Sequence, residues 1–298
     1  MMAPSRPEWL KVRPPGGGAY AGLKESLRTL ELHTVCEEAR CPNVAECWAE
    51  GTATVMLLGD VCTRGCRFCA VKTGNPAGAV DEAEPHRVAA AVAKWGLKYV
   101  VLTMVNRDDL ADGGAEVVAR TVETLHALDP DLLVEVLVGD FQGDEAAISR
   151  VLAAQPDVFA HNVETVERLT PVVRDRRADF AQSLRVLAAA KRIAPEMVTK
   201  SSIMLGHGET EDEVRAAMAA LRSAGVDIVT FGQYLRPSAW HLAVQSYIPP
   251  ARFEAWKDEA LALGFRFCAS GPLVRSSYRA AEAFAEGLVR SRRAGQGA

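Results

Sequence analysis

The chain has 298 residues, 49% hydrophobic and 24% charged, which is enough for one large domain, two small ones or a single α/β barrel, and which excludes general disorder. The 34 Lys and Arg residues nearly balance the 38 Asp and Glu residues, and the net charge of −4 argues against a nucleic-acid-binding protein. No apolar run approaches the roughly 18 residues that cross a bilayer, and the N-terminus lacks the apolar core of a signal peptide. We therefore expect a cytoplasmic protein that binds neither nucleic acid nor membrane.

The first 50 residues differ in pattern from the rest. Residues 1–25 contain the run Pro14-Pro-Gly-Gly-Gly18, which predicts an extended arm. Residues 28–50 carry three cysteines but too few periodic apolar residues to form a core of their own. We therefore expect an inorganic group to help hold this segment together.

From residue 53 onward, apolar runs rich in β-branched residues alternate with stretches in which apolar residues recur every three or four positions. The predicted strands cover 53–58, 98–104, 132–138, 156–160, 197–204 and 227–231. The predicted helices cover 84–95, 114–127, 144–154, 177–193, 210–223 and 251–263. This alternation predicts an α/β fold with a parallel sheet, specifically a partial (β/α)6 TIM-like barrel. We expect an N-terminal extension over 1–50, the barrel over 51–270, and a C-terminal segment over 271–298 that covers the barrel mouth.

Three cysteines, Cys62, Cys66 and Cys69, follow the first predicted strand with the spacing C-x3-C-x2-C, and Gly65 lets the backbone fold tightly around a bound group. Three thiolates at this spacing can bind zinc, but a structural zinc site takes four ligands and no fourth Cys or His follows nearby. An iron–sulfur cubane held by three thiolates instead leaves one iron open to a small molecule. A pair of structural zinc sites remains the alternative for the clustered cysteines.

A second group, Cys36, Cys41 and Cys47, has the spacing C-x4-C-x5-C and indicates a second cluster. It also lacks a fourth protein ligand, which could be Cys268 or an oxygen ligand from elsewhere in the chain. Cys268 lies in an apolar run, where a lone cysteine is most often a small buried hydrophobe. We therefore leave it out of the predicted site.

The first cysteine motif, with Phe68 before its last cysteine, resembles that of the radical S-adenosylmethionine superfamily. The two motifs together resemble the lipoyl synthase family, and the likeness extends along nearly the whole chain. Further matching stretches are 106–110, 140–143, 161–165, 199–201, 232–235 and 271–278. The resemblance implies two 4Fe–4S clusters and S-adenosylmethionine as cofactors. It also implies an activity in which the second cluster gives two sulfur atoms to C6 and C8 of an octanoyl chain on a lysine of a lipoyl carrier domain, with two S-adenosylmethionine molecules cleaved per product.

The resemblance also suggests site residues. It implies that the segment Arg275-Ser-Ser-Tyr278 supplies a serine ligand to the second cluster, with Ser277 preferred over Ser276. Contacts to S-adenosylmethionine are expected from Phe68, from the turn Asp112, Gly113 and Gly114, and from Asn162 and Glu164. Two further candidates follow from position: Lys200 in the middle of a buried-looking strand, and Gln233 at the end of another. No residue is assigned as a catalytic acid, base or nucleophile, since the cofactor carries the radical chemistry.

Several other residues have simpler interpretations. Asn106–Asp109 form a loop after the second strand, where a site role is expected. His161 is expected to be structural, and the arginines at 174, 176 and 177 are expected to form a solvated face or to meet an acidic carrier domain. Met104 and His207 depart from the residues expected of the family.

The expected partners are octanoylated lipoyl domains, namely those of the E2 subunits of 2-oxoacid dehydrogenases and the H protein of glycine cleavage, and an electron donor such as ferredoxin or flavodoxin. A methylthiotransferase would need a substrate-binding domain after the barrel, for which only about 60 residues remain. A metal-storage or scaffold module is the alternative that is not an enzyme.

Overall fold

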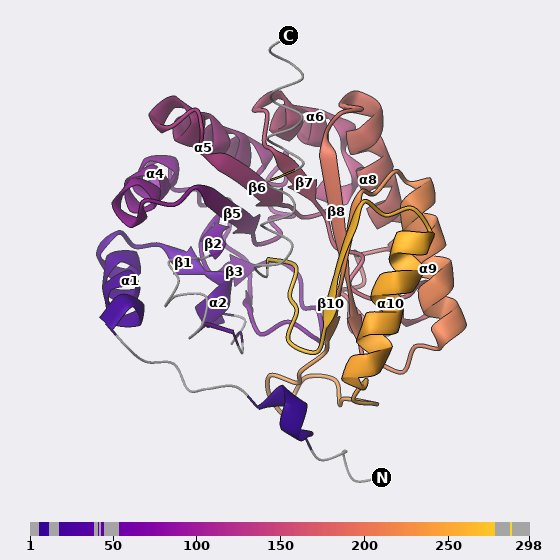
Figure 1. Ribbon diagram of the computed structural model, residues 1–298. Coiled ribbons are helices and arrows are strands. Elements are labelled where there is room, and N and C mark those ends of the chain that lie inside the picture. Colours follow the sequence, from indigo (N-terminus) through magenta and orange to yellow (C-terminus); the bar gives the residue numbers. More distant parts are fainter. Residues whose placement is uncertain are drawn as a thin grey trace. The chain divides into compact units, whose positions relative to one another are not determined.

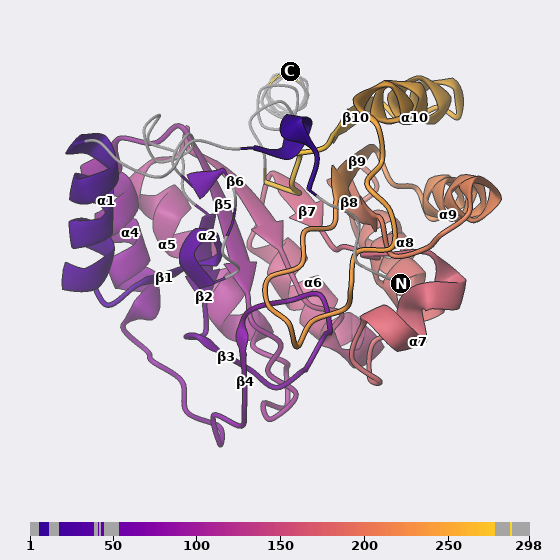
Figure 2. The ribbon, with the colours of Figure 1, turned by 90° about the horizontal axis from the view of Figure 1, so that it is seen from below.

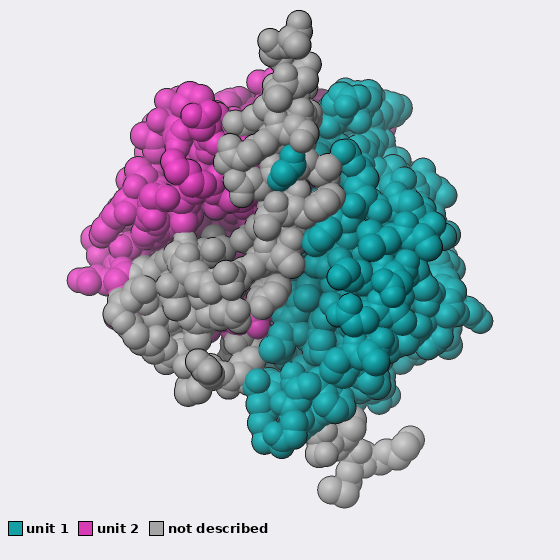
Figure 3. Space-filling view, viewed as in Figure 1, with its two compact units in different colours: residues 1–11, 65–69, 160–298 teal, residues 12–64, 70–159 magenta. Residues whose placement is uncertain are grey.

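A computed structural model describes residues 6–11, 18–38, 41, 43–44, 54–277 and 287. The chain divides into two compact units, which Figure 3 colours separately. Unit 1 comprises residues 1–11, 65–69 and 160–298, and unit 2 comprises residues 12–64 and 70–159. None of the helices within the described ranges is long and apolar enough to cross a membrane.

Unit 2 is built on strands β1 (His33–Thr34), β2 (Thr54–Leu57), β5 (Tyr99–Met104), β6 (Leu133–Leu137) and the start of β7 (Val158–Ala160), in that order. The register places Val55 beside Leu102 and Leu102 beside Val136 in parallel pairs, whereas β1 runs antiparallel to β2. A separate parallel pair joins β3 (Val61–Cys62) to β4 (Lys72–Thr73). The carboxyl ends of β5 and β6 therefore lead into loops at the same edge of the sheet.

The helices of unit 2 are amphipathic and bury one face. They are α1 (Gly18–Thr29), α2 (Val35–Glu38), α4 (Glu84–Trp95), α5 (Ala115–Leu128) and α6 (Glu145–Ala153), with a short 3-10 turn at Phe141–Gly143. Helix α4 buries Val88 and Val92, and α5 buries Val118 and Val122, each pair four residues apart as one helical face requires. Helices α4 and α5 lie side by side in Figures 1 and 2.

Unit 1 contains the parallel strands β8 (Val198–Leu205), β9 (Ile228–Gln233) and β10 (Phe267–Gly271). Its helices are α7 (Thr170–Val173), α8 (Phe180–Ile193), α9 (Glu211–Ser223) and α10 (Pro250–Ala262), with 3-10 turns at Glu8–Leu10 and Glu167–Leu169. Met218 of α9 and Phe253 of α10 are fully buried in one apolar core with Phe231 of β9. This core fixes the strand ends of unit 1.

The predicted α/β class is confirmed, because each of the six predicted strand-and-helix pairs occurs within a few residues of its expected bounds. The prediction of an extended arm over residues 1–25 is wrong from Gly18 onward, since α1 begins at the last glycine of the run and buries Ser26 and Leu27. Strand β10 was not predicted, because its short sequence Phe-Cys-Ala-Ser-Gly lacks alternation. Residues 278–286 and 288–298 of the expected C-terminal cover lie outside the described residues, and the boundaries at 50 and 270 stay predictions.

Candidate functional site

The first half of the cysteine loop belongs to unit 2. Cys62 ends β3, and its carbonyl accepts a hydrogen bond from the Gly74 amide at 2.9 Å. The Arg64 amide lies 3.4 Å from Cys62 Sγ and donates toward it. The Thr63 amide and hydroxyl both donate to Asn106 O, each at 2.9 Å. The loop after β5 therefore fixes the backbone that carries Cys62.

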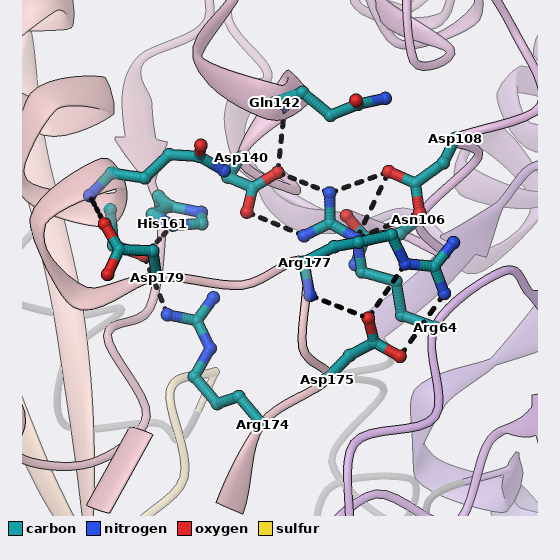
Figure 4. A network of polar contacts seen from close by, with 12 residues as sticks. Arg64, Asn106, Asp108, Asp140, Gln142, His161, Arg174, Asp175, Arg177 and Asp179 are labelled. Atoms are coloured by element: carbon teal, nitrogen blue, oxygen red, sulfur yellow. Dashed lines mark hydrogen bonds and ion pairs between the residues drawn. The ribbon is translucent and has the colours of Figure 1, made fainter. Parts of the chain in front are cut away.

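Arg64 is buried between two carboxylates that follow β5 and β6. Its guanidinium reaches Asp108 at 2.7 Å and Asp140 at 2.6 Å, as Figure 4 shows, and the Asp140 side chain is fully buried. Burial by itself would lower the pKa of Arg64, but the hydrogen bonds and charges of Asp108 and Asp140 raise it. The guanidinium is therefore charged at every physiological pH and fixes the residue between Cys62 and Gly65.

A cavity of about 290 Å³ lies beside Arg64 within unit 2. It is lined by Arg64, Met104, Asn106, Arg107, Asp108, Ala111, Gly113, Phe141, Gln142, Gly143 and Asp144. Arg107 is paired with Asp109 at 2.8 Å, and hydrogen bonds from Arg107 lower the pKa of Asp109 to about 2. The lining combines charged groups with the apolar Met104 and Phe141, as a small-molecule site requires.

The predicted glycine turn borders this cavity. The Asp112 carboxylate accepts hydrogen bonds from the Gly114 amide at 2.9 Å and the Glu116 amide at 2.8 Å, so it caps the start of α5. Gly113 and Gly114 have φ values of 63° and 92°, which only glycine adopts readily. A Cβ atom on Gly114 would also collide with the Leu58 side chain. The Gly113 amide donates to Leu110 O at 3.1 Å, so the amides of the turn and the Asp112 carboxylate are engaged within it, and Gly113 itself lines the cavity wall.

The second half of the cysteine loop, Gly65–Cys69, belongs to unit 1. Asp175 binds it twice: its carboxylate accepts from the Gly65 amide at 2.9 Å, and its amide donates toward Cys66 Sγ at 3.3 Å. The Arg67 amide donates to Val173 O at 2.9 Å. Phe68 packs against the apolar core of unit 1. Backbone amides point at the sulfur atoms of Cys62 and Cys66, as they do toward the sulfur ligands of iron–sulfur clusters, and this fits both residues as ligands.

The residues after β7 form a second candidate site for a ligand. Asn162 donates to the Glu164 carboxylate at 3.2 Å, and its own Oδ1 is buried without a hydrogen-bond partner among the described residues. Glu164 has φ 66°, which is strained for a residue with a side chain. Burial raises the pKa of Glu164, against the opposing effects of the Arg174 charge and the Asn162 hydrogen bond. A strained, desolvated carboxylate beside an open amide oxygen suits a bound polar molecule.

The remaining predicted contacts lie in the strands of unit 1. Lys200 is fully buried in β8, as the sequence predicted. Gln233 ends β9, but its amide nitrogen donates to backbone oxygens, including Ser246 O at 3.0 Å, and its oxygen accepts from the Ile248 amide at 2.8 Å. Gln233 therefore holds the loop after β9, and a ligand contact from it stays a prediction.

The second cysteine group is described only in part. Cys36 is buried in α2, and Cys41 is half-buried with its amide donating to Cys36 O at 3.0 Å. Cys47 lies outside the described residues. Ser277 is half-buried in the turn after β10. In the same turn Val274 O lies so close to Gly232 that a Cβ atom on residue 232 would collide with it. Within the described ranges, no three side chains of His, Cys, Asp or Glu are grouped as a metal-ion site.

The structure decides three predictions for single residues. Cys268 is 1% exposed in the unit 1 core, and burial raises its pKa to about 12, which confirms it as a buried hydrophobe. The solvated-face interpretation is wrong for Arg174, which is buried and donates to Ser183 Oγ at 2.7 Å. His161 Nε2 lies 2.9 Å from the same hydroxyl, in agreement with a structural role.

Sequence reasoning missed the residues that support the cysteine loop. Arg64 lies inside the first motif, and a basic residue flanked by two cysteines could have been matched with the aspartates after β5 and β6. Asp175 was not considered because it lies within a run of three arginines. His241 belongs to no recognisable motif. Their partners are remote in sequence, so the pattern alone carries no signal for them.

Comparison with known proteins adds an independent line of argument. Residues 56–231 match the family model of the Radical SAM superfamily, and residues 3–41 match that of the N-terminal domain of lipoyl synthase. The chain is 63% identical to a lipoyl synthase of Sorangium cellulosum, over 95% of this chain and 80% of the relative. It is 60% identical to a lipoyl synthase of Anaeromyxobacter dehalogenans, over 98% and 99% of the two chains. A mitochondrial lipoyl synthase of Penicillium rubens is 56% identical, over 98% and 71%.

Two solved structures share the fold. Methylornithine synthase (PylB) matches with a TM-score of 0.56 and 14% identity over 88% of each chain. HydG, a maturase of the [FeFe]-hydrogenase, matches with a TM-score of 0.58 and 12% identity over 94% of this chain and 61% of that one. At such identities the likeness concerns the fold alone.

Proposed function

The chain belongs to the lipoyl synthase family of the radical S-adenosylmethionine superfamily, and from that premise we propose that it inserts two sulfur atoms into an octanoyl chain carried on a lysine of a lipoyl domain. The sites of insertion are C6 and C8. The observation that carries the proposal is identity of 56–63% over nearly the whole chain in relatives named lipoyl synthase.

The cofactors of this family are S-adenosylmethionine and two 4Fe–4S clusters. When bound, the first cluster and S-adenosylmethionine supply a radical that abstracts hydrogen from an unactivated methylene, which no acid, base or nucleophile of the chain can do. Cys62, Cys66 and Cys69 hold that cluster. The amides of Arg64 and Asp175, which already point at two of these sulfurs, stabilise the thiolates.

Each unit of the chain carries its own candidate groups for S-adenosylmethionine. In unit 2 the turn Asp112–Gly114 borders the cavity, which Gly113 lines. In unit 1 the open Asn162 Oδ1 accepts a hydrogen bond from the cofactor, Glu164 binds a donor of the same molecule, and Phe68 contacts its adenine. Lys200 and Gln233 complete the proposed set. Cleavage of the cofactor itself requires no proton transfer by the protein.

The second cluster is the sulfur source and is therefore a substrate. Cys36, Cys41, Cys47 and Ser277 hold it. An alkoxide is an unusual ligand for these clusters, and protonation lets it leave its iron as sulfur is given up. A Ser277→Cys variant should keep the cluster yet transfer sulfur more slowly, and normal transfer with the cluster still consumed would contradict this role.

The acceptor is a lipoyl domain. We assign it to the E2 subunits of 2-oxoacid dehydrogenases and the H protein of glycine cleavage, with ferredoxin or flavodoxin as electron donor. The six clustered cysteines need a reducing compartment to stay available as ligands, which supports a cytoplasmic location.

The test uses full-length protein reconstituted anaerobically with iron and sulfide, then given dithionite, S-adenosylmethionine and an octanoyl-lysine peptide. The peptide should gain two sulfur atoms, and two hydrogens should be lost when the two thiols close to a disulfide. A Cys62→Ala variant should form no 5′-deoxyadenosine, and a Cys47→Ala variant should form it without the product. Cofactor cleavage by the wild-type chain without sulfur insertion would refute the substrate, and no cleavage with two intact clusters would refute the radical chemistry.

A further inference from the structure

A loop of unit 1 donates hydrogen bonds to two carbonyl oxygens in the second half of the cysteine motif. The loop runs from Tyr234 to Leu242, after β9. The Leu242 amide donates to Arg67 O at 3.1 Å, and His241 Nε2 lies 2.9 Å from Cys69 O. One contact is made by backbone and the other by a side chain, so the second can be changed by a substitution while the first remains.

Both ring nitrogens of His241 have hydrogen-bond partners. A carbonyl oxygen only accepts hydrogen bonds, so Nε2 carries the proton that it donates to Cys69 O. Nδ1 lies 2.8 Å from the Ser238 hydroxyl, its second partner. His241 is 8% exposed, and Trp240 packs edge-on against its ring with centroids 5.0 Å apart. The orientation of the ring is therefore fixed from both sides.

The loop that presents His241 is itself held from within unit 1. Arg236 Nε donates to His241 O at 2.8 Å and a second guanidinium nitrogen donates to Ala239 O. The Tyr234 hydroxyl donates to Leu242 O at 2.8 Å, and Tyr234 is almost fully buried. These hydrogen bonds hold the loop in one conformation and so fix the position of His241. A residue that positions another must itself be held in this way.

The contact falls at the residue where orientation matters most. Cys69 is the last proposed ligand of the first cluster, and Phe68 before it is the proposed adenine contact. A displacement of the Cys69 backbone would shift both side chains, because the two residues are adjacent in the chain. The Asp175 and Val173 contacts hold Gly65, Cys66 and Arg67, upstream of this point. His241 acts on the end of the loop that these contacts do not reach.

We propose that His241 is a positioning residue, which orients Cys69 and Phe68 so that S-adenosylmethionine binds the first cluster productively, and that Ser238 fixes the ring orientation this requires. The inference rests on the proposed function. A displacement of about 1 Å in a reacting group can cost on the order of 100-fold in rate. Loss of the hydrogen bond should therefore act on cofactor binding and cleavage far more than on cluster loading.

The experiment compares full-length, anaerobically reconstituted wild type with His241→Phe, which keeps a ring but loses the donor, and His241→Gln, which keeps an N–H donor. Ser238→Ala keeps the imidazole and removes its hydroxyl partner. His86→Phe, in the exposed part of α4, is the matched control. Iron and sulfide per chain, the EPR spectrum of the reduced first cluster with and without S-adenosylmethionine, and 5′-deoxyadenosine formation are measured. Cys36→Ala combined with Cys41→Ala and Cys47→Ala isolates the first cluster for the spectra.

His241→Phe should load iron as the wild type does, but its EPR spectrum should respond weakly to S-adenosylmethionine, and 5′-deoxyadenosine formation should fall by about 10- to 100-fold. His241→Gln should restore most of both, and Ser238→Ala should lie between. The control should match the wild type.

A normal spectral response and normal cleavage in His241→Phe would overturn the proposal, as would failure of His241→Gln to improve on it. If His241→Phe does not fold, Ser238→Ala decides, and an unchanged spectrum and cleavage rate there overturn the proposed role. A wild-type chain that loads its cluster but never cleaves the cofactor refutes the proposed function instead, so the two failures are distinct.

Discussion

The two halves of the cysteine loop are held by different kinds of interaction. In unit 2 the stretch Cys62–Arg64 depends on a buried guanidinium between two carboxylates. In unit 1 the stretch Gly65–Cys69 accepts hydrogen bonds from the Leu242 amide and the His241 ring and donates one to Val173 O, with the Asp175 carboxylate as the charged exception. Removing the partner of a buried charge lowers the free energy of unfolding by several kcal/mol. Removing one hydrogen bond between uncharged groups lowers it by about 1 kcal/mol. The first half should therefore be the more sensitive to substitution in stability, and the second half in cofactor geometry.

The largest effect is expected from Arg64→Leu. The variant leaves the fully buried Asp140 carboxylate without its guanidinium, which should cost about 3–5 kcal/mol in the free energy of unfolding. Urea unfolding of the cluster-free protein measures it. Arg120→Leu, which removes an exposed pair with Glu82 in the same unit, is the control and should cost less than about 1 kcal/mol. Equal losses in the two variants would contradict the proposed difference between the halves.

His207 sharpens the comparison, because its buried imidazole makes no hydrogen bond to any residue that the structure describes. Both ring nitrogens lack partners among the described residues, the ring stacks on Tyr234 at 4.1 Å, and burial lowers the pKa of His207 to about 4. Between this pKa and the unfolded value of about 6.5, the unfolded chain binds more protons, so stability must fall as pH falls.

His207→Leu should therefore be more stable than the wild type at pH 7.5 by about 1 kcal/mol, and its advantage should widen by about 3 kcal/mol on going to pH 4. Urea unfolding of both proteins across this range gives the difference, in which the other titrating groups cancel. An advantage that stays constant with pH would show that His207 is protonated as easily in the folded state as in the unfolded one.

Asp175→Asn tests the charged exception in unit 1. Burial would raise the pKa of Asp175, but hydrogen bonds from Arg177 and the Gly65 amide hold it well below its usual range (Figure 4). Its contribution is then present above the unfolded pKa of about 4 and is lost as pH falls. The variant should lose about 1–2 kcal/mol at pH 7, and this loss should shrink steadily as pH falls below about 4, measured by thermal or urea unfolding. A loss that persists in acid would assign the effect to packing.

The smallest effect is expected from Tyr234→Phe. It removes the hydroxyl that donates to Leu242 O but keeps the ring under His207, so about 1 kcal/mol should be lost. Burial raises the pKa of Tyr234 to about 12, so the loss should be the same from pH 6 to 9. A cost as large as that of Arg64→Leu would show that the neutral contacts are no weaker than the charged ones.

Much of the fold follows from the sequence because local periodicity decides it. Helix α4 occupies the predicted residues 84–95, and β5 to β9 lie within one or two residues of expectation, since strands and helices bury one face with fixed spacing. The glycine turn at 113–114 could also be predicted from the sequence, because its positive φ angles favour glycine. Helix α1 was missed from Gly18 onward because the run of prolines and glycines before it obscured its start.

The sequence alone also determined the chemistry: six cysteines in two spacings, with Phe68 and Ser277 in matching segments, select the family and its cofactors. Only the tertiary structure decided what holds those cysteines in place. Arg64 meets Asp108 and Asp140 from 44 and 76 residues away, and His241 reaches Cys69 across 172. A hydrogen bond is set by the position of two atoms after the strands have packed, and no local pattern records which distant residues will be brought together.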